Sequence, residues 1–398
     1  MFGLDEATAR VRDSRPKARI PAVRFVRSLL VMLWVRMGSL NGLEQGRSCR
    51  LWQRWLDGPV PSADALGDAA AALSLDDLRE ELHGQYTVLK RNKAIRPLPR
   101  GFLVLILDAH EAGASYLRRS TGSLQRKVKT AKGERVQFYY RHVAAMLRHA
   151  VGEVLLDIEP QRAGEDEIAA ATRLFERLVS RYPRAFDLVS GDALYLHPGF
   201  CRLVRRHGKH FLAVLKNEHR DLVADVRGLV PLVTPVCWQE GNTQVACWDI
   251  PDLTTWPQYG EPVRVLRSVE TTQVRRQLTR EREAQQAEWL WGTSVPPWKA
   301  PAPLLVRLGH GRWSIENQGF NEIVNAWHGD HIYKNHPNAI AAFYLLLFLA
   351  YNLFHALLTR DLKPALRAAY TMAFLAEKVR AAFYEATPLR ARGQPRAP

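Results

Sequence analysis

The chain has 398 residues, 47% of them apolar and 24% charged, which is the composition of a globular protein with room for two or three domains. Its 56 Lys and Arg against 40 Asp and Glu give a net charge of +16. The basic residues are spread along the whole chain, which predicts a polyanionic partner such as nucleic acid. The four cysteines show no zinc-ligand spacing, which argues against a zinc site or a disulfide framework.

Residues 1–98 are predicted to form an all-α N-terminal domain. The pattern is helical from about 22 to 93, with Ser62 and Ser74 as candidate N-caps. The last of these helices ends in a basic cluster that includes Lys90, Arg91 and Lys93. Helices with basic ends favour a DNA-binding domain, and a helical cap that serves only packing is the alternative.

Residues 99–218 have a different pattern and are predicted to form the first part of an α/β core. The apolar run 102–107 reads as a buried strand that ends at Asp108, and basic, flexible residues follow it up to Gly133. Further strands are expected at these ranges: 137–146, 153–158, 186–190 and 210–215. Amphipathic helices at 165–182 and 198–207 complete a mixed sheet with helices on its faces.

The remaining chain divides into three predicted parts. Residues 219–298 contain short β-like runs between turn residues and read as a β-rich insertion. Residues 299–385 are expected to return to the core as helices, and the Arg/Pro-rich tail 386–398 to be disordered. The apolar run 339–358 is long enough to span a membrane, but a buried core helix is favoured because it contains Asn352 and His355.

Three carboxylates define the candidate site. Asp108 and Asp192 each follow a predicted buried strand, and open α/β sheets bind ligands at the carboxyl ends of their strands. Gly191 is expected to let the backbone turn and present Asp192. Glu316 lies four residues after Arg312, on one face of the helix that we expect to pack against the two aspartates.

Such a set of ligands predicts the metal and its chemistry. Three hard oxygen ligands without cysteine suit Mg²⁺ or Mn²⁺. Two such ions form a template for phosphodiester chemistry, because one activates the attacking oxygen and the other stabilises the leaving oxygen. We therefore expect Asp108, Asp192 and Glu316 to bind two ions.

The same residues resemble a known family. The motifs Leu107-Asp108, Gly191-Asp192-Ala193-Leu194-Tyr195, Val214-Leu215-Lys216-Asn217 and Arg312-Trp313-Ser314-Ile315-Glu316-Asn317 look like those of the DDE transposases of bacterial insertion sequences. More narrowly, the chain is similar to the cut-and-paste branch. This resemblance implies an RNase H-like core interrupted by a β-rich insertion, with the two aspartates and the glutamate as metal ligands.

Two positions depart from the family signature, which has Tyr three residues before the Arg and Lys seven after the Glu. Here these positions hold Gly309 and Ile323. His310, His331 and Lys334 are candidates to take over their contacts with DNA, with ordinary polar surface residues as the alternative.

Other residues are predicted to contact DNA or to pack. Arg312 is assigned to a DNA phosphate, with a pair to Glu316 as the alternative. Lys209 and Lys216 are expected as phosphate contacts at the sheet edge of Asp192, while Glu111 is interpreted as a loop carboxylate. Three tryptophans could stack on a base, although packing within the insertion is favoured for each of them: Trp238, Trp256 and Trp298.

The predicted function is thus a DNA transposase that cleaves transposon ends and transfers the strands into target DNA. Double-stranded DNA is the expected partner, a homodimer on DNA the expected assembly, and the bacterial cytoplasm, at the nucleoid, the expected location. The alternatives are an RNase H-like nuclease, a domesticated DNA-binding relative and, more weakly, a membrane-associated protein.

Overall fold

The structure of the chain is a computed structural model that describes residues 3–16, 18–48, 55–56, 58–131, 133–216, 219–275, 280 and 282–385. The predicted disordered tail, 386–398, and Asn217 of the quoted motif lie outside these residues.

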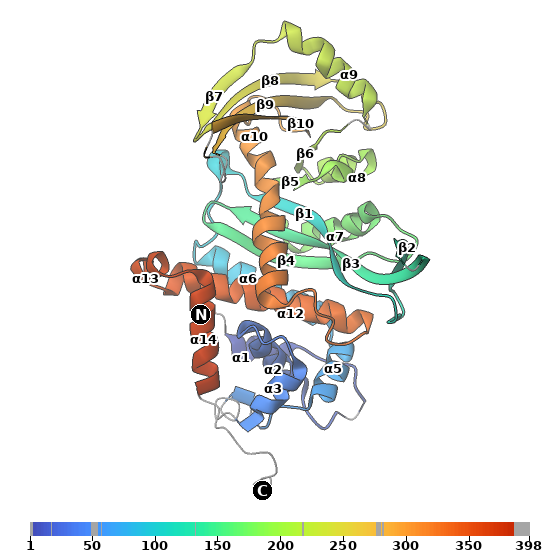
Figure 1. Cartoon of the computed structure of the whole chain (residues 1–398), viewed down its shortest axis with the longest axis vertical. Helices are drawn as coiled ribbons and strands as arrows, with labels where there is room; N and C mark the ends of the chain where they lie inside the picture. Colours follow the sequence, from blue (N-terminus) through green and yellow to red (C-terminus); the bar gives the residue numbers. More distant parts are fainter. Residues whose placement is uncertain are drawn as a thin grey trace.

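The described strands form one mixed ten-stranded sheet, which runs from β1–β4 in the middle of Figure 1 to β7–β10 at its top. Its first half consists of β1 (Val104–Ser115), β2 (Leu124–Thr130), β3 (Gly133–His149), β4 (Gly152–Pro160), β5 (Leu188–Gly191) and β6 (His210–Val214). The order β4-β3-β1-β5-β6 joins three antiparallel strands to two strands parallel to β1. This arrangement confirms the predicted RNase H-like fold class.

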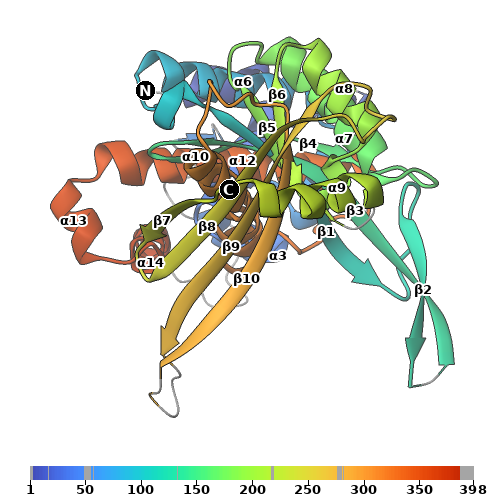
Figure 2. The same cartoon turned by 90° about the horizontal axis from the view of Figure 1, so that it is seen from above.

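The second half of the sheet is the β-rich insertion. Its strands are β7 (Val236–Glu240), β8 (Thr243–Leu253), β9 (Val263–Arg275) and β10 (Arg282–Thr293), preceded by helix α9 (Arg220–Leu229). β10 pairs antiparallel with β6, so the insertion continues the core sheet. β9 and β10 form a long hairpin that reaches away from the body of the molecule in Figure 2.

Two hydrophobic clusters cover the two faces of the core sheet. On one face, Leu105 and Leu107 of β1 pack in a cluster with α7 (Glu167–Arg181) and α8 (Pro198–Arg206). On the other face, Val104 and Ile106 pack in a cluster that includes the N-terminal helices and the C-terminal helical segment. Because strand residues alternate between faces, Asp108 belongs to this second face.

Helices at both ends of the chain share that second cluster. The N-terminal helices are α1 (Leu4–Arg10), α2 (Ala22–Trp34), α3 (Leu40–Gln45), α5 (Ala63–Ala72) and α6 (Leu75–Arg91). As predicted, the Ser62 and Ser74 side chains cap α5 and α6. Of these helices, α2, α5 and α6 pack against α12 (Pro337–Ala356), the horizontal helix below the middle of Figure 1. Helices α13 (Pro364–Ala369) and α14 (Met372–Glu385) follow it.

In the described part of the chain one segment, Pro337–Asp361, is long and apolar enough to cross a membrane. Of its most apolar window, 89% is buried inside the molecule. The polar Asn352 does not face lipid there, since its amide bonds the backbone of Leu155 and the side chain of Gln85. The segment therefore packs as the expected core helix.

A continuous helical segment carries Glu316. It runs through α10 (Ala302–His310), a 3-10 turn (Gly311–Trp313), the π-helical turn η6 (Ile315–Phe320) and α11 (Asn321–Trp327), and is the vertical orange helix of Figure 1. His328, with a φ of +55°, ends it. Residues 328–336 therefore separate the helical segment of Glu316 from the apolar helix that begins at Pro337.

One correction concerns the segment after Asp108. The predicted strand stops at residue 107, whereas β1 continues through Asp108 and Glu111 to Ser115. The basic residues expected to be flexible include those of strand β2, which pairs with the first part of β3. This pairing builds a two-stranded hairpin that projects from the body in Figure 2.

Candidate active site

Asp108 and Asp192 lie in equivalent positions on neighbouring strands. β1 and β5 are parallel, with Ile106 opposite Ser190. Asp108 follows Ile106 by two residues, and Asp192 follows Ser190 by two residues. Both side chains therefore belong to the same face of the sheet, at the point where the two strands stop pairing. The sequence placed each of them at a strand end, which the structure shows for Asp192 but not for Asp108.

Gly191 serves a different purpose from the expected one. Its backbone is not in the left-handed region, so no special turn requires glycine there. A Cβ at this position would instead lie 2.4 Å from the Tyr195 ring, which packs directly on the backbone. The glycine therefore makes room for Tyr195 beneath the loop that presents Asp192.

Glu316 comes to the aspartates from the helical segment that covers their face of the sheet. The π-helical turn η6 packs against β1. Phe320 of this turn stacks on His110 of β1, with 4.7 Å between the ring centroids. A π-helical turn widens the helix locally and is common at functional sites. The contact fixes the glutamate's turn against the strand that carries Asp108.

Arg312 lies between two of the three carboxylates. Its Nη1 donates a 2.8 Å hydrogen bond to Glu316 Oε1 and lies 3.7 Å from Asp108 Oδ2. Arg312 is only 7% exposed, and its Nε is buried without a hydrogen-bond partner. Of the two roles considered for it, the pair with Glu316 is the one formed in this structure.

The environment of Asp108 favours its protonated form. Burial raises its pKa to about 7; Arg312 opposes this shift, and the negative charges of Asp192, Glu167 and Glu316 add to it. A buried carboxylate among other carboxylates needs more positive charge than one arginine supplies. This is the electrostatic setting in which a divalent cation binds.

The residues fit a hard divalent metal by their chemistry, although they are not preassembled around one point. In the part of the chain that the structure describes, no three His, Cys, Asp or Glu side chains form a ready metal site. Arg312 holds Glu316 by a direct hydrogen bond instead. As hard oxygen donors, the carboxylates of Asp108, Asp192 and Glu316 fit Mg²⁺ or Mn²⁺ by their chemistry.

Sequence reasoning missed a fourth carboxylate beside the site, Glu167 at the start of α7. It is 6% exposed, accepts a 3.0 Å hydrogen bond from Tyr195 and pairs with Arg141 at 2.7 Å. Its pKa is raised by burial and by the charge of Asp192, with Arg141 opposing the shift. Its position at the first turn of an amphipathic helix gave no signal, because acidic residues are common there.

Both departures from the family signature have a packing reason. Gly309 faces the Trp291 ring, and a Cβ would lie 2.7 Å from it, so no tyrosine fits. Ile323, at the lysine position, is fully buried and packs against Gly329. Neither position faces solvent.

The three candidates to replace those residues have partners within the protein. His310 lies 2.7 Å from Glu270 and packs among Trp289, Trp291 and Trp313. Lys334 pairs with Asp68 of α5 at 2.6 Å. His331 is exposed and contacts the Tyr333 ring, which leaves it the most accessible of the three.

The prediction that Lys209 shares the sheet edge of Asp192 is wrong. β6 is parallel to β5, and Lys209 precedes its first residue, so it lies at the opposite edge. There its Nζ donates to the carbonyls of Pro183 and Phe186, both at 2.8 Å. Lys216 follows the end of β6, is exposed, and does lie at the edge of Asp192.

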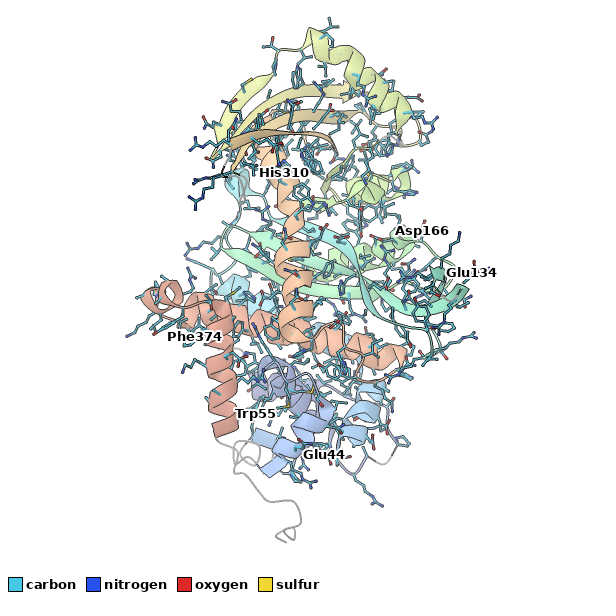
Figure 3. All side chains as sticks on the ribbon, in the orientation of Figure 1. Glu44, Trp55, Glu134, Asp166, His310 and Phe374 are labelled. Atoms are coloured by element: carbon cyan, nitrogen blue, oxygen red, sulfur yellow. The ribbon has the colours of Figure 1, made fainter. Side chains whose placement is uncertain are left out.

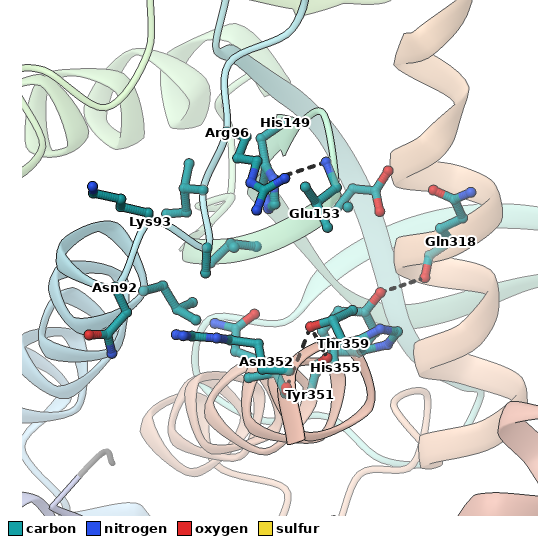
Figure 4. A pocket seen from close by; sticks show the side chains of 18 of the residues that line it. Asn92, Lys93, Arg96, His149, Glu153, Gln318, Tyr351, Asn352, His355 and Thr359 are labelled. Atoms are coloured by element: carbon teal, nitrogen blue, oxygen red, sulfur yellow. Dashed lines mark hydrogen bonds between the residues drawn. The ribbon is translucent and has the colours of Figure 1, made fainter. Parts of the chain in front are cut away.

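The basic cluster at the end of α6 is also remote from the carboxylates along the sheet. Lys90 donates to the carbonyl of Arg184, beside the Lys209 contacts. Lys93 lies at the rim of a cavity of about 550 Å³, shown in Figure 4 with Arg96 and His149. Gln318 reaches this cavity from the segment that carries Glu316. Lys90 thus lies at the end of the sheet opposite the aspartates, whereas Lys93 shares a cavity with the turn that carries Glu316.

The tryptophans differ in their surroundings. Trp256 is buried and stacks on Tyr259, as expected for packing within the insertion. The same expectation is wrong for Trp298, which is 81% exposed. The next residue, Lys299, lies over the ring of Phe102. Phe102 precedes the first residue of β1, so this contact is at the end of the strand away from Asp108. Trp238 is half-buried in β7.

Figure 3 shows where two of these elements lie. His310 is on the orange helical segment beneath the insertion, and Asp166 is at the start of α7. An RNase H-like sheet with acidic side chains at this edge defines a class of nucleases and polynucleotidyl transferases.

A family model described as "Transposase DDE domain" matches residues 99–353, more than half of the chain. The chain therefore belongs to the transposase DDE domain family. The match spans all three carboxylates and the insertion. Proteins of this family act on DNA and normally use divalent metal ions. Comparison with curated proteins gives no match.

Proposed function

We propose that the chain is a DNA transposase that cuts at transposon ends and joins the freed 3′ ends to target DNA. The observation that carries this proposal is the placement of Asp108 and Asp192 just beyond the last paired residues of the adjacent parallel strands β1 and β5, with the turn of Glu316 packed against β1. The net charge of +16 supports binding to the DNA backbone.

Each residue has a distinct part in the proposed reaction. Asp108, Asp192 and Glu316 would hold two Mg²⁺ or Mn²⁺ ions, which when bound activate the attacking oxygen and stabilise the leaving one. Arg312, released from Glu316, would bind a DNA phosphate beside the site. Lys216, at the same sheet edge as Asp192, would position the strand. Glu167 and Tyr195 would support the loop of Asp192 from the other face.

The assembly and location follow from the same proposal. A transposition reaction handles two DNA ends, which favours a homodimer on DNA in the bacterial cytoplasm, at the nucleoid. The exposed His331 and the basic end of α6, with Lys90, Arg91 and Lys93, offer further surfaces for the duplex. The buried setting of Pro337–Asp361 leaves the membrane alternative without support.

A specific experiment tests the site. The full chain would be incubated with duplex DNA carrying the sequences that flank its gene, with Mg²⁺ or Mn²⁺, and the products resolved for nicks and joined strands. Asp192→Asn should abolish both products, whereas Asp225→Asn, on α9 of the insertion, should keep them. Metal-dependent cleavage that survives in Asp192→Asn would refute the site.

The nuclease alternative gives a different product pattern. A nuclease on the same core cuts but never joins strands. A chain that binds DNA without cutting, in the presence of either metal, would be a domesticated relative. Recovery of DNA joined to a target through its 3′ ends distinguishes the transposase from both.

A further inference from the structure

The hairpin formed by β2 and the first part of β3 is a projecting arm. We define the arm as Leu124–Thr130 together with Gly133–Tyr139. At its base, Phe138 and Tyr139 also pair with β1, whereas the rest of the arm is a ribbon of two strands that extends into solvent (Figure 2). Most of its side chains are exposed. An isolated two-stranded ribbon of this kind is of marginal stability without a partner.

The arm carries far more positive than negative charge. Among its described residues it has four basic side chains, Arg126, Lys127, Lys129 and Arg135, and one acidic side chain, Glu134. The connection from β1 adds Arg118 and Arg119. Figure 3 marks Glu134 close to the outer end of the ribbon. Lys127 and Lys129 lie on one face of the ribbon, where Lys127 pairs with Glu134 at 3.0 Å, and Arg126 and Arg135 lie on the other face. The ribbon therefore offers positive charge to a polyanion on both faces.

Both arginines of the arm lie over aromatic rings. Arg126 lies 4.5 Å from the Tyr139 ring and Arg135 lies 4.5 Å from the Tyr116 ring. Stacked guanidinium groups lose little further freedom when they bind phosphate, so the contact is preorganised.

The base of the arm is fixed to the candidate active site. Arg126 forms two hydrogen bonds with Glu111, at 2.7 and 2.8 Å, and Glu111 lies three residues after Asp108 on β1. Tyr140 donates to Asn335 at 3.0 Å and contacts Ser120, which ties the arm to the loop 328–336. At the β1 bulge, Gly113 packs against Ile332 of the same loop.

The distance along β3 from the position opposite Asp108 to the outer end of the arm matches one turn of DNA. Ala144 of β3 pairs with Asp108, and Gly133 at the outer end is 144 − 133 = 11 residues away. At about 3.3 Å per residue the end of the arm reaches up to ~36 Å from the aspartate. One turn of a DNA duplex is about 34–36 Å long.

A groove of about 630 Å³ runs along one side of the arm's base. It is lined by the connection Arg119–Gln125, by Phe138 and Tyr139, and by the loop residues before α7. A two-stranded β-ribbon fits the major groove of DNA, and a groove beside it leaves space for a flanking strand.

We propose that the arm binds the DNA duplex about one helical turn away from the position that is cut, with Lys127, Lys129 and Arg135 on its phosphates. The arm thereby sets the register of the duplex at the carboxylates. This inference rests on the proposed function for the identity of the ligand and goes beyond it in assigning the contact.

The test compares two variants with equal loss of charge. The arm variant is Lys127→Ala/Lys129→Ala/Arg135→Ala, which leaves the Arg126–Glu111 pair intact. The control variant is Arg206→Ala/Arg220→Ala/Arg227→Ala, at exposed positions of α8 and α9. Binding of a fluorescent duplex of about four helical turns is measured against salt concentration, and thermal unfolding of each variant is recorded.

Loss of three phosphate contacts should reduce the slope of log K against log salt by roughly 2.7 in the arm variant, and the control variant should keep the wild-type slope. Hydroxyl-radical footprints around the mapped cut should lose protection about one turn away in the arm variant alone. A charge-preserving variant, Lys127→Arg/Lys129→Arg/Arg135→Lys, should restore both.

The outcomes separate the two proposals. In one outcome the wild-type chain cuts DNA, and the arm variant folds like the wild type and keeps the wild-type slope of log K against log salt and the wild-type footprint. The arm proposal is then wrong, and the proposed function stands. If the arm variant weakens binding as expected but no carboxylate-dependent cutting is found, the arm holds as a DNA contact and the proposed function fails. A wild-type chain that does not bind duplex DNA overturns both.

Discussion

Arg312 and Glu316 are joined by a 2.8 Å hydrogen bond on one side of the helical segment, and the same Arg312 nitrogen lies 3.7 Å from Asp108. In this structure the guanidinium thus supplies the positive charge among the carboxylates. A divalent cation would compete with it for the same oxygens. Binding of a DNA phosphate to Arg312 would therefore release the carboxylates for the metal.

Replacing Arg312 by methionine should strengthen metal binding in the absence of DNA. The variant removes the competing cation, and we expect the affinity for Mn²⁺ to rise roughly three- to fivefold, the effect of a partly exposed ion pair. Isothermal titration with Mn²⁺ at a pH above that at which Asp108 ionises measures it. Arg307→Met, at an exposed position of α10, is the matched control. An unchanged or lower affinity in Arg312→Met would contradict this role, and DNA cleavage should fall in the same variant.

Asp108 should make the stability of the metal-free protein fall as the pH rises. Its folded-state pKa, about 7, lies above its ordinary value of 3.8, so the folded state holds a proton that the unfolded state has lost between these values. The stabilisation that protonated Asp108 gives to the folded state is complete below about pH 4. It is lost as the pH rises to 7, at about 1.36 kcal/mol of unfolding free energy per pH unit. Relative to Asp108→Asn, the wild type should lose up to about 4 kcal/mol of unfolding free energy over this window.

Urea unfolding of both proteins in metal-free buffer at several pH values measures this difference. Added Mn²⁺ should recover the wild type's stability above pH 7, because it binds the folded state alone. Parallel pH curves for the wild type and Asp108→Asn would show that the carboxyl is not buried as described.

Tyr195→Phe should weaken the fold beside the site. The change removes the 3.0 Å hydrogen bond to buried Glu167 and leaves that carboxylate with Arg141. We expect a loss of about 1–3 kcal/mol in the unfolding free energy and slower DNA cleavage. Tyr182→Phe is the control, since the buried Tyr182 hydroxyl has no hydrogen-bond partner, and its removal should cost nothing. Equal effects of the two changes would contradict the assignment.

Gly309→Ala should destabilise the protein by about 1–3 kcal/mol, because its Cβ would lie 2.7 Å from the indole of Trp291. Restoring the family's tyrosine at this position should be worse still. Gly84→Ala in α6 is the control: no atom lies within 4 Å of its Cβ position, so the change should stabilise the helix by about 0.5–1 kcal/mol. Thermal unfolding of the two variants measures both changes in stability. A Gly309→Ala variant as stable as the wild type would show that Trp291 can move.

The sequence was most informative where a short apolar run is buried on both faces. The runs around Ile106 and Val189 predicted two core strands, and the charged residue after each run marked Asp108 and Asp192 as candidates for one site. The strand order that makes them neighbours is not contained in either run and was not predicted. Glu316 was linked to them through its helix, which was expected to pack on the sheet, and the family resemblance implied the same three ligands.

Features that depend on distant partners were not predictable in this way. Strand β2 is polar and exposed, so it lacks the alternation that identifies a half-buried strand, and only its partner β3 holds it extended. Glu167 is buried beside Tyr195 and Arg141, which are distant from it in sequence and bond its carboxylate. The edge on which Lys209 lies depends on the direction of β6, which a single run of residues does not reveal.

The position of α12 also determines when the chain can fold during synthesis. The helices up to Arg91 pack on a helix that begins at Pro337, so their core partner leaves the ribosome only after about 250 further residues. At roughly 5–20 residues per second this delay is on the order of 10–50 s. For that time the apolar faces of α2 and α5 stay uncovered on the nascent chain. A prematurely terminated product would expose them permanently, which makes such fragments substrates for chaperones and proteases.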